Sequence, residues 1–438
     1  MREVEFVSPF QLTELQSGIG REQFPPLRRV TQSFPRESEP DVPGAVRRAL
    51  EPFLPNVKPG ARIAVTAGSR GIVRLPEVTR EAVRCLSEAG AKPFIVPAMG
   101  SHGGASAEGQ QALLANLGIS EQTVGCPVVS GMETVQLGTT SHGFPVYMDR
   151  NAAQADAILP INRVKPHTSI VGPVESGLCK MLVIGLGKQA GADRIHKQAL
   201  KVPLGELVLE GSKIIVESPQ VTLLGGLAVV ENAHKEIARI AGLALDDHAR
   251  LVAEEGALLD EARRLMPRLP FEEIDALIVE EIGKDVSGTG MDTNVIGRKE
   301  GVDRPRIGAI YVRGLTEETH GNAHGVGMAD VIPRRLLSHF DLNAMYMNAF
   351  TSRRMAQSKI PLLTETDLQA LQVCMGFRED EAPDSARLVW IRNTGRLGQL
   401  LVSRALLPEV EANPLLEALP GEVPLVFDAE DGLASPWD

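Results

Sequence analysis

Two histidines and an arginine each follow a short apolar segment of the sequence. Arg70 follows the segment 62–66, His102 follows 93–97, and His167 follows 157–164. If these segments are parallel strands, their carboxyl ends share one edge of a sheet, which is where ligands of such folds bind. The spacing therefore predicts that two imidazoles and one guanidinium face one crevice. Each residue taken alone also fits a solvated loop or a helix cap.

The segment 162–196 is the densest in residues suited to chemistry, and it contains five glycines. Lys180 lies in the apolar stretch 178–184, where an amine loses its charge easily and can act as a nucleophile or an attachment point. A lysine stem extended along a helix edge is the structural alternative. His196 follows sixteen residues later on a predicted helix, and imidazole suits nickel or zinc. One histidine is not a metal site, so further ligands would come from elsewhere.

Other polar glycine-rich segments give weaker signals. Gly185 and Gly187 do not complete a dinucleotide-binding fingerprint, and no phosphate-binding GxxxxGK[ST] loop is present. In the loop 288–298, Asn294 and Arg298 are candidates for binding a phosphate or carboxylate of a cofactor. His320 and His324 have a metal-ligand spacing, but the glycines around them favour a mobile loop over a helix.

Alternating strands and helices of 10–15 residues predict an α/β fold. We expect two α/β domains with largely parallel sheets and an active-site cleft between them. The prolines at 267 and 270 predict a boundary, with an N-terminal domain over 1–268 that carries the histidines and Lys180, and a C-terminal domain over 269–438. Residues 1–45 are expected to be an irregular lead-in, and 332–340 a helix.

The net charge, the cysteine pattern and the apolar content of the chain limit the kinds of partner and compartment that we expect. The formal net charge of −11 opposes binding to nucleic acid or to anionic lipid. Four cysteines without a CxxC pair fit a reducing compartment. No apolar stretch approaches the about 20 residues of a spanning helix, and the first twenty residues do not look like a secretory signal. We therefore expect a cytoplasmic protein without nucleic-acid or membrane partners.

The combined pattern resembles the nickel-dependent lactate racemase family, which includes 2-hydroxyacid racemases and epimerases. That family has an Arg after the first strand, a His in a glycine-flanked turn, a Pro-His after a later strand, and a Lys followed sixteen residues later by a His. Here these look like Arg70, His102 in GSHGG, His167 in KPH, Lys180 and His196. The family's usual Asp before the Arg is Ala67, so the resemblance indicates a distant branch that acts on a hydroxyacid other than lactate.

The resemblance implies a cofactor and roles for these residues. The family's cofactor is a nickel-pincer nucleotide, the nickel complex of pyridinium-3-thioamide-5-thiocarboxylic acid mononucleotide, tethered to the Lys and completed by the His as nickel ligand. Lys180 would thus be the tether and His196 the nickel ligand. In hydride-transfer racemisation, two opposite stereoisomers call for two bases, for which His102 and His167 are the candidates, while Arg70 binds the substrate carboxylate. Proteins that build the cofactor and insert nickel are the implied partners.

Two other classes use the same residues. One is a metal-dependent hydrolase or lyase, which firm metal binding without an organic adduct would favour. The other is a non-catalytic protein that binds a small acid or a cofactor, which tight binding without exchange of the C2 hydrogen would favour.

Overall fold

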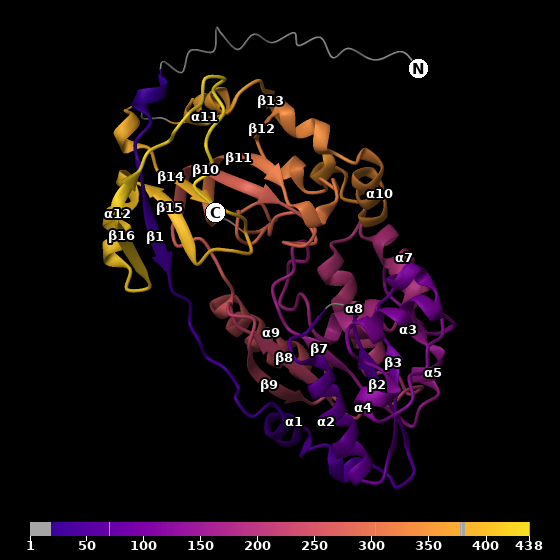
Figure 1. Ribbon diagram of the computed structural model, residues 1–438. Helices are drawn as coiled ribbons and strands as arrows, with labels where there is room; N and C mark the ends of the chain where they lie inside the picture. The colour runs from indigo at the N-terminus through magenta and orange to yellow at the C-terminus, as the bar shows by residue number, and fades with distance from the viewer. Residues whose placement is uncertain (1–18, 70, 303, 377, 379–381, 438) are drawn as a thin grey trace, which may run out of the picture. The chain divides into compact units, whose positions relative to one another are not determined.

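A computed structural model describes residues 19–69, 71–302, 304–376, 378 and 382–437. The chain divides into two compact units (Figure 1). One contains Pro35–Met266, and the other combines the N-terminal segment up to Phe34 with Pro267–Asp438. Both units mix helices with strands, so the predicted α/β class is confirmed.

The first unit holds three small sheets and the helices that cover them. Its elements are α1 (Val42–Leu50), β2 (Arg62–Ala67), α2 (Leu75–Glu88), β3 (Lys92–Pro97), α3 (Ala107–Asn116), α4 (Glu121–Val124), β4 (Thr134–Thr139), β5 (Pro145–Asp149), α5 (Arg150–Ala153), β6 (Ala157–Leu159), β7 (Ile161–Arg163), α6 (Leu178–Lys180), α7 (Lys188–Gln198), α8 (Leu204–Val216), β8 (Gly226–Glu231), β9 (Ile237–Leu243) and α9 (His248–Leu265).

The central strands of this unit are parallel and run in the order β3-β2-β6. After Arg62, every residue of β2 is buried, as is typical of a parallel strand covered on both faces. The helix α2 packs on β2 and β3. The carboxyl ends of β2 and β3 therefore lie at one edge, as the sequence predicted.

The strand expected over 157–164 is two strands in two different sheets. β6 pairs with β2, whereas β7 pairs in parallel with β8, which pairs antiparallel with β9. Pro160 separates them, since proline has no N–H with which to continue the ladder. The chain thus passes from one sheet to the next directly before the loop of His167.

The second unit contains an eight-stranded mixed sheet in the order β13-β12-β11-β10-β14-β15-β1-β16. The first five strands of this order are parallel, and the last three join antiparallel. Its elements are β1 (Leu27–Gln32), β10 (Glu273–Ile282), β11 (Arg306–Leu315), β12 (Val331–Pro333), α10 (Leu342–Ser352), β13 (Leu362–Thr364), α11 (Asp367–Met375), β14 (Leu388–Ile391), β15 (Gln399–Ser403), α12 (Leu407–Ala412) and β16 (Leu416–Val423).

The structure of this unit differs from two of the sequence-based expectations. Residues 27–32 form β1 between β15 and β16, so they belong to this sheet and not to the N-terminal domain expected over 1–268. Residues 332–340 are not one helix, because β12 runs through Pro333 and a 3₁₀ helix follows over Arg334–His339. Among the helices of the described residues, none has the length and apolar character needed to cross a bilayer.

Candidate functional site

Four chain segments of the first unit meet around Gly68, the residue that follows β2. A Cβ atom built on Gly68 would lie 3.2 Å from Met181 Cε, 4.0 Å from the Ala98 carbonyl oxygen and 4.0 Å from Asn162 Oδ1. These neighbours come from the residue next to Lys180, from the end of β3 and from β7. The predicted convergence of strand ends is therefore present, and the segment of Lys180 takes part in it.

His102 lies in an exposed turn that two contacts hold against this edge. Its Nδ1 is 2.5 Å from the Ser69 hydroxyl, which follows β2. Gln110 of α3 donates from Nε2 to the carbonyl oxygens of Gly100 (2.9 Å) and His102 (3.3 Å). At Gly100 the chain has a φ of +59°, and a Cβ there would lie 3.2 Å from the Ile184 carbonyl oxygen. Only glycine fits this turn without strain.

A buried lysine, Lys188, holds the segments next to the turn of His102. The Lys188 ammonium donates to the Pro97 carbonyl oxygen (2.5 Å) and to Gln110 Oε1 (2.9 Å), and lies 3.1 Å from Asp149 Oδ2. These three partners match the three donors of an ammonium group. Burial lowers the pKa of Lys188, and the Asp149 carboxylate opposes that change. Lys188 thus links the end of β3, α3 and the end of β5.

The loop of His167 is anchored by a buried carboxylate. Glu175 accepts the His167 backbone N–H (2.6 Å) through Oε2 and Arg263 Nη2 (2.9 Å) through Oε1. The Nδ1 atom of His167 accepts the backbone N–H groups of Ser169 and Ile170, both at 3.1 Å. In the neutral ring the proton therefore resides on Nε2, so this imidazole presents a hydrogen-bond donor.

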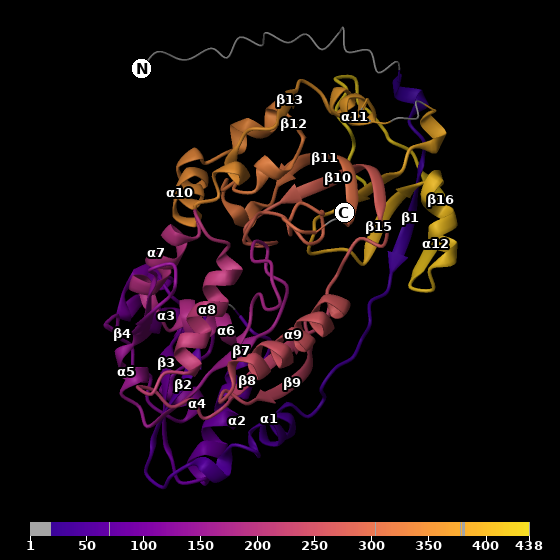
Figure 2. The same cartoon turned by 180° about the vertical axis from the view of Figure 1, so that it is seen from behind.

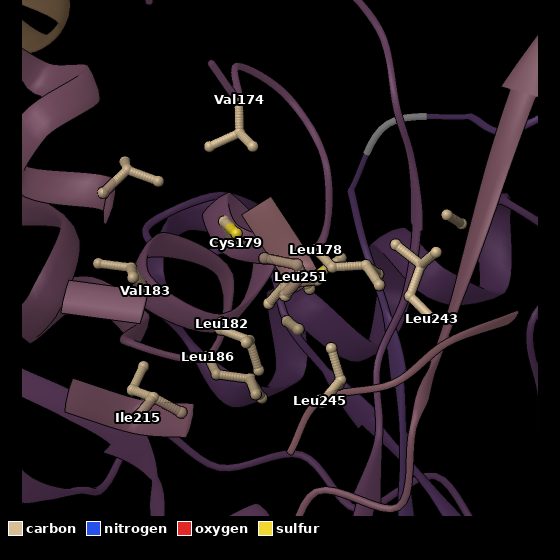
Figure 3. Packing of buried hydrophobic residues seen from close by; sticks show 14 of the residues in the cluster. Val174, Leu178, Cys179, Leu182, Val183, Leu186, Ile215, Leu243, Leu245 and Leu251 are labelled. Atoms are coloured by element: carbon tan, nitrogen blue, oxygen red, sulfur yellow. The ribbon is translucent and has the colours of Figure 1, made fainter. Parts of the chain in front are cut away.

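Lys180 is half-buried at the end of α6, and a π-helical turn over Met181–Gly185 continues the helix. Figure 3 shows Leu178, Cys179, Leu182 and Val183 packed with Ile215 of α8 and Leu251 of α9. Figure 2 shows α6 beside α8, and the two helices are in contact. This packing fixes the helix that carries the Lys180 amine.

The half-buried His196 lies on α7, whose packing brings it toward the turn of His102. Ala192 Cβ is 3.4 Å from the position of a Cβ on Gly100, and His196 lies one helical turn further along the same face as Ala192. The Gly100 N–H also donates to the Gly185 carbonyl oxygen, at 3.1 Å. Within the described residues, no three side chains of His, Cys, Asp or Glu gather as a metal site would require.

Three of the five glycines of 162–196 allow protein segments to pack closely. A Cβ on Gly177 would lie 2.3 Å from Glu255 Oε1, one on Gly185 would lie 2.6 Å from Met181 Sδ, and one on Gly187 would lie 2.3 Å from the Val183 carbonyl oxygen. Close packing of the helix that carries Lys180 therefore accounts for these residues.

Three predicted residues are not part of this cluster as described. Arg70 lies outside the described residues. Asn294 and Arg298 belong to the other unit, where Asn294 donates to Asp292 and receives a hydrogen bond from Lys299, and the Arg298 guanidinium is 2.8 Å from Asp330 Oδ2. Their predicted role in cofactor binding stays a prediction.

The loop that the sequence marked at His320 and His324 belongs to the second unit, and one of its two histidines is buried. His324 is buried and its Nδ1 is 2.9 Å from the Ser358 hydroxyl. Burial and the nearby Lys284 ammonium lower the pKa of His324 to about 4. This ring is therefore neutral at pH 7.

The sequence analysis missed Lys188 and Glu255, two buried charged residues next to the site. A signal for Glu255 was present, because it falls on the apolar stripe of α9 that also contains Leu251, Leu258 and Ala262. Lys188 gave no such signal, since its burial depends on Gln110 and Asp149, which are distant in sequence.

Comparisons with known proteins agree with this organisation. Residues 33–203 match the family model described as the lactate racemase N-terminal domain. The lactate racemase apoprotein from Thermoanaerobacterium thermosaccharolyticum has a similar fold, with a TM-score of 0.51 at 12% identity over 84% of this chain and 98% of that chain. A structural-genomics protein from Thermotoga maritima matches with a TM-score of 0.45 at 16% identity over 62% of this chain and 70% of that one. The search of curated proteins gave no match.

The matched segment contains β2, β3, β7, α6 and α7, which are the elements that meet at the site. This part of the chain is therefore similar to a lactate racemase N-terminal domain. The family model covers less than half of the chain, and the match to the lactate racemase apoprotein at 12% identity shows a shared fold.

Proposed function

We propose that this protein is an isomerase that interconverts the stereoisomers of a small 2-hydroxyacid, with a nickel-pincer nucleotide attached to Lys180. The observation that carries the proposal is the meeting of four segments around Gly68. These segments lead to Ser69, His102, His167 and Lys180. The family of the N-terminal domain supports the same reaction class.

The residues present fit the cofactor by the chemistry of their donors. Lys180 offers a primary amine that is half-buried on a tightly packed helix, as an amide-like tether needs. His196 offers an imidazole from a helix that packs against the same turn, and nickel accepts an imidazole beside soft sulfur ligands. Asn294 and Arg298 are our candidates for further contacts with the cofactor.

When bound, the pyridinium group would supply the acceptor for the hydride of the substrate C2–H bond, and it would give that hydride back. The protein's own residues would handle the proton of the substrate hydroxyl and orient the substrate. A guanidinium binds a carboxylate through two parallel hydrogen bonds, and Arg70 is our candidate for that contact.

The hydrogen bonds at Nδ1 favour different tautomers of the two histidines, His102 and His167. The Ser69 hydroxyl lies against Nδ1 of His102 and can accept from it, and in the tautomer that carries the proton on Nδ1 the basic nitrogen of the ring is Nε2. His167 instead presents Nε2–H, since two backbone N–H groups occupy its Nδ1. His102 thus suits the base, while His167 donates a hydrogen bond to the substrate oxygen and becomes a base only when its loop releases Nδ1.

Peptide mass spectrometry tests the attachment. The protein is produced in cells that supply the nickel-pincer nucleotide and is then digested with trypsin. Trypsin cuts after Arg163, does not cut the Lys165–Pro166 bond, and cuts after an unmodified Lys180. A tethered Lys180 blocks that last cut, so we expect a heavier peptide that runs from Val164 to Lys188.

Lys180→Arg is the matched control, because it keeps the charge and the trypsin cut but has no amine to attach. We expect only the shorter, unmodified peptide from this variant. Finding only that peptide in the wild-type chain, while a known racemase is loaded in the same cells, would refute the tether. The plain metalloenzyme and binding-protein alternatives would then replace the proposal.

A further inference from the structure

A fully buried carboxylate lies against the start of the helix that carries Lys180. Glu255 of α9 accepts the backbone N–H groups of Leu178 (2.7 Å) and Cys179 (3.1 Å) through its Oε2 atom. These are the two residues directly before Lys180. The first turn of a helix has N–H groups without partners in the helix, and Glu255 satisfies two of them.

The chain is shaped around this contact. A Cβ on Gly177 would lie within 2.3–2.9 Å of all three carboxyl atoms of Glu255, so only glycine leaves room for the carboxyl group. Asn162 of β7 donates to the Gly177 carbonyl oxygen at 2.7 Å. Gly177 is thus held from one side by the strand that leads to His167 and from the other by Glu255.

Burying the Glu255 carboxyl group costs more free energy than a purely structural contact would justify. Glu255 is surrounded by the apolar cluster that contains Leu178, Leu251 and Leu259, and its Oε1 atom has no hydrogen-bond partner. Burial raises the pKa of Glu255 to about 7, although the two N–H groups oppose that change. Replacing buried ionic groups by apolar ones of similar size is often neutral or stabilising. Stability alone therefore gives little reason for a carboxyl group here.

We propose that Glu255 is a positioning residue for Lys180, which it serves by fixing the turn Leu178–Lys180 so that the amine leaves the helix in one direction. This inference rests on the proposed attachment of the cofactor to Lys180. It concerns geometry only, since Glu255 touches the backbone before Lys180 and acts through it.

Three variants of the full-length chain separate positioning from stability. Glu255→Gln keeps the size of the side chain but removes the carboxylate. Glu254→Gln makes the same change one residue earlier on α9, where Glu254 pairs with Arg250 and is partly exposed. Leu259→Ala destabilises the same buried cluster from the next turn of α9 and leaves the Glu255 carboxylate in place.

Two readouts are measured on each variant. Hydrogen exchange of the Leu178 and Cys179 amides reports the turn without any cofactor. Attachment per folded chain, by tryptic mass spectrometry after production with the nickel-pincer nucleotide, reports the position of the amine. For Glu255→Gln we expect exchange of these amides to rise about tenfold, because their hydrogen bonds to a charged carboxylate become weaker ones to a neutral amide oxygen. We also expect attachment to fall about tenfold or more, because small misplacements of reacting groups are costly.

Both control variants should attach the cofactor as the wild type does. Wild-type attachment in Glu255→Gln would overturn the positioning role while the proposed function stands. An equal fall in Leu259→Ala would also overturn it, because the effect would then be one of stability. No attachment in the wild-type chain would refute the proposed function itself, and the exchange measurement would still show whether Glu255 holds the turn.

Discussion

The two units place charged residues differently around the carboxyl ends of their parallel strands. In the unit of residues 35–266, the loops of His102 and His167 are at least partly exposed, and the charges that hold them, Lys188 and Glu175, are buried behind them. In the other unit, the charged residue near the end of β11 is Arg313, which is itself buried. In the first unit the buried charges thus lie behind partly exposed histidines, whereas in the second unit the charged residue is itself part of the buried interior.

The partners of Arg313 show what the second arrangement does. Its guanidinium contacts Glu280 (2.5 Å) and Asp367 (3.3 Å), lies over the Trp390 ring at 5.1 Å, and donates to the Leu433 carbonyl oxygen. The Leu433 N–H donates in turn to Asp367 at 2.7 Å. These contacts join three strands, β10, β11 and β14, with α11 and the C-terminal segment. The comparison teaches that a charged residue near a strand end indicates a site only when its partners leave it accessible.

The largest effect we expect is on catalysis, from His102→Asn. Loss of a positioned acid or base should slow interconversion by about 10²–10⁴-fold on the 2-hydroxyacid that the wild type turns over. Racemisation and bound nickel are measured together, and nickel per chain should stay unchanged. His167→Asn should behave alike, and His142→Asn, an exposed histidine of the same unit, is the control. Loss of nickel in the first two variants would instead make those residues ligands or structural groups.

The next largest effect should come from Lys188→Met, which tests whether buried charge really supports the site. The substitution leaves the Asp149 carboxylate buried without its cation, and breaking a buried pair costs about 3–5 kcal/mol. Urea unfolding followed by circular dichroism measures this free energy. Lys197→Met, at an exposed pair with Asp193, should change it by less than about 1 kcal/mol. If the two substitutions lowered the free energy of unfolding equally, the buried Lys188 ammonium would stabilise the unit no more than an exposed one does.

Local patterns in the sequence predicted much of the fold and part of the site. The apolar runs at 62–66 and 93–97 are the strands β2 and β3. The helix α9 has local signals of the same kind, since the Asp247 side chain caps its start and its apolar residues repeat at helical spacing. These features depend on neighbours within a few residues, so periodicity and capping reveal them. His102 became a candidate because its position after a strand is itself a local feature, and its role stays a prediction.

Long-range contacts could not be predicted in the same way. β1 pairs Thr31 with Gln399, and the sequence of residues 27–32 does not indicate a pairing partner so distant along the chain. The break at Pro160 was visible as a proline, but the change of sheet depends on where β8 lies. Lys188 and Glu255 were missed because burial of one charged residue among many depends on tertiary packing.

Glu255 should make the stability of the first unit fall as the pH rises. The pKa of Glu255 is about 7 in the folded chain, against an ordinary value of 4.5. The folded state therefore holds more protons than the unfolded state between these values, and stability decreases across this range by about 3 kcal/mol. Hydrogen exchange of the α9 amides at several pH values measures it. Glu255→Gln should remove the slope, and a slope that persists in this variant would assign it to another group.

His324 should act in the opposite direction in the second unit. The pKa of His324 is about 4 when folded, below its ordinary value of 6.5, because burial and Lys284 disfavour the charged ring. The unfolded state holds more protons between these values, so stability is full above pH 6.5 and is lost as the pH falls toward 4. Both tryptophans, Trp390 and Trp437, belong to this unit, so fluorescence-detected unfolding reports on it. His324→Gln should unfold with a flatter pH dependence, and an unchanged dependence would contradict the assignment.

The smallest effect on stability should come from Arg298→Gln. This variant tests whether Arg298 has a structural role in its unit or is available to contact a cofactor. The Arg298–Asp330 pair is about one-third exposed on both sides, and such pairs contribute less than about 1 kcal/mol. We therefore expect tryptophan-detected unfolding to shift only slightly, in contrast to Arg313→Gln, which leaves Glu280 and Asp367 without their shared cation. Because Arg298 is an accessible guanidinium, its proposed contact with the cofactor predicts a few-fold loss of attachment at Lys180 in this variant. Unchanged attachment, together with a stability loss as large as that of Arg313→Gln, would place Arg298 with the structural charges of its unit.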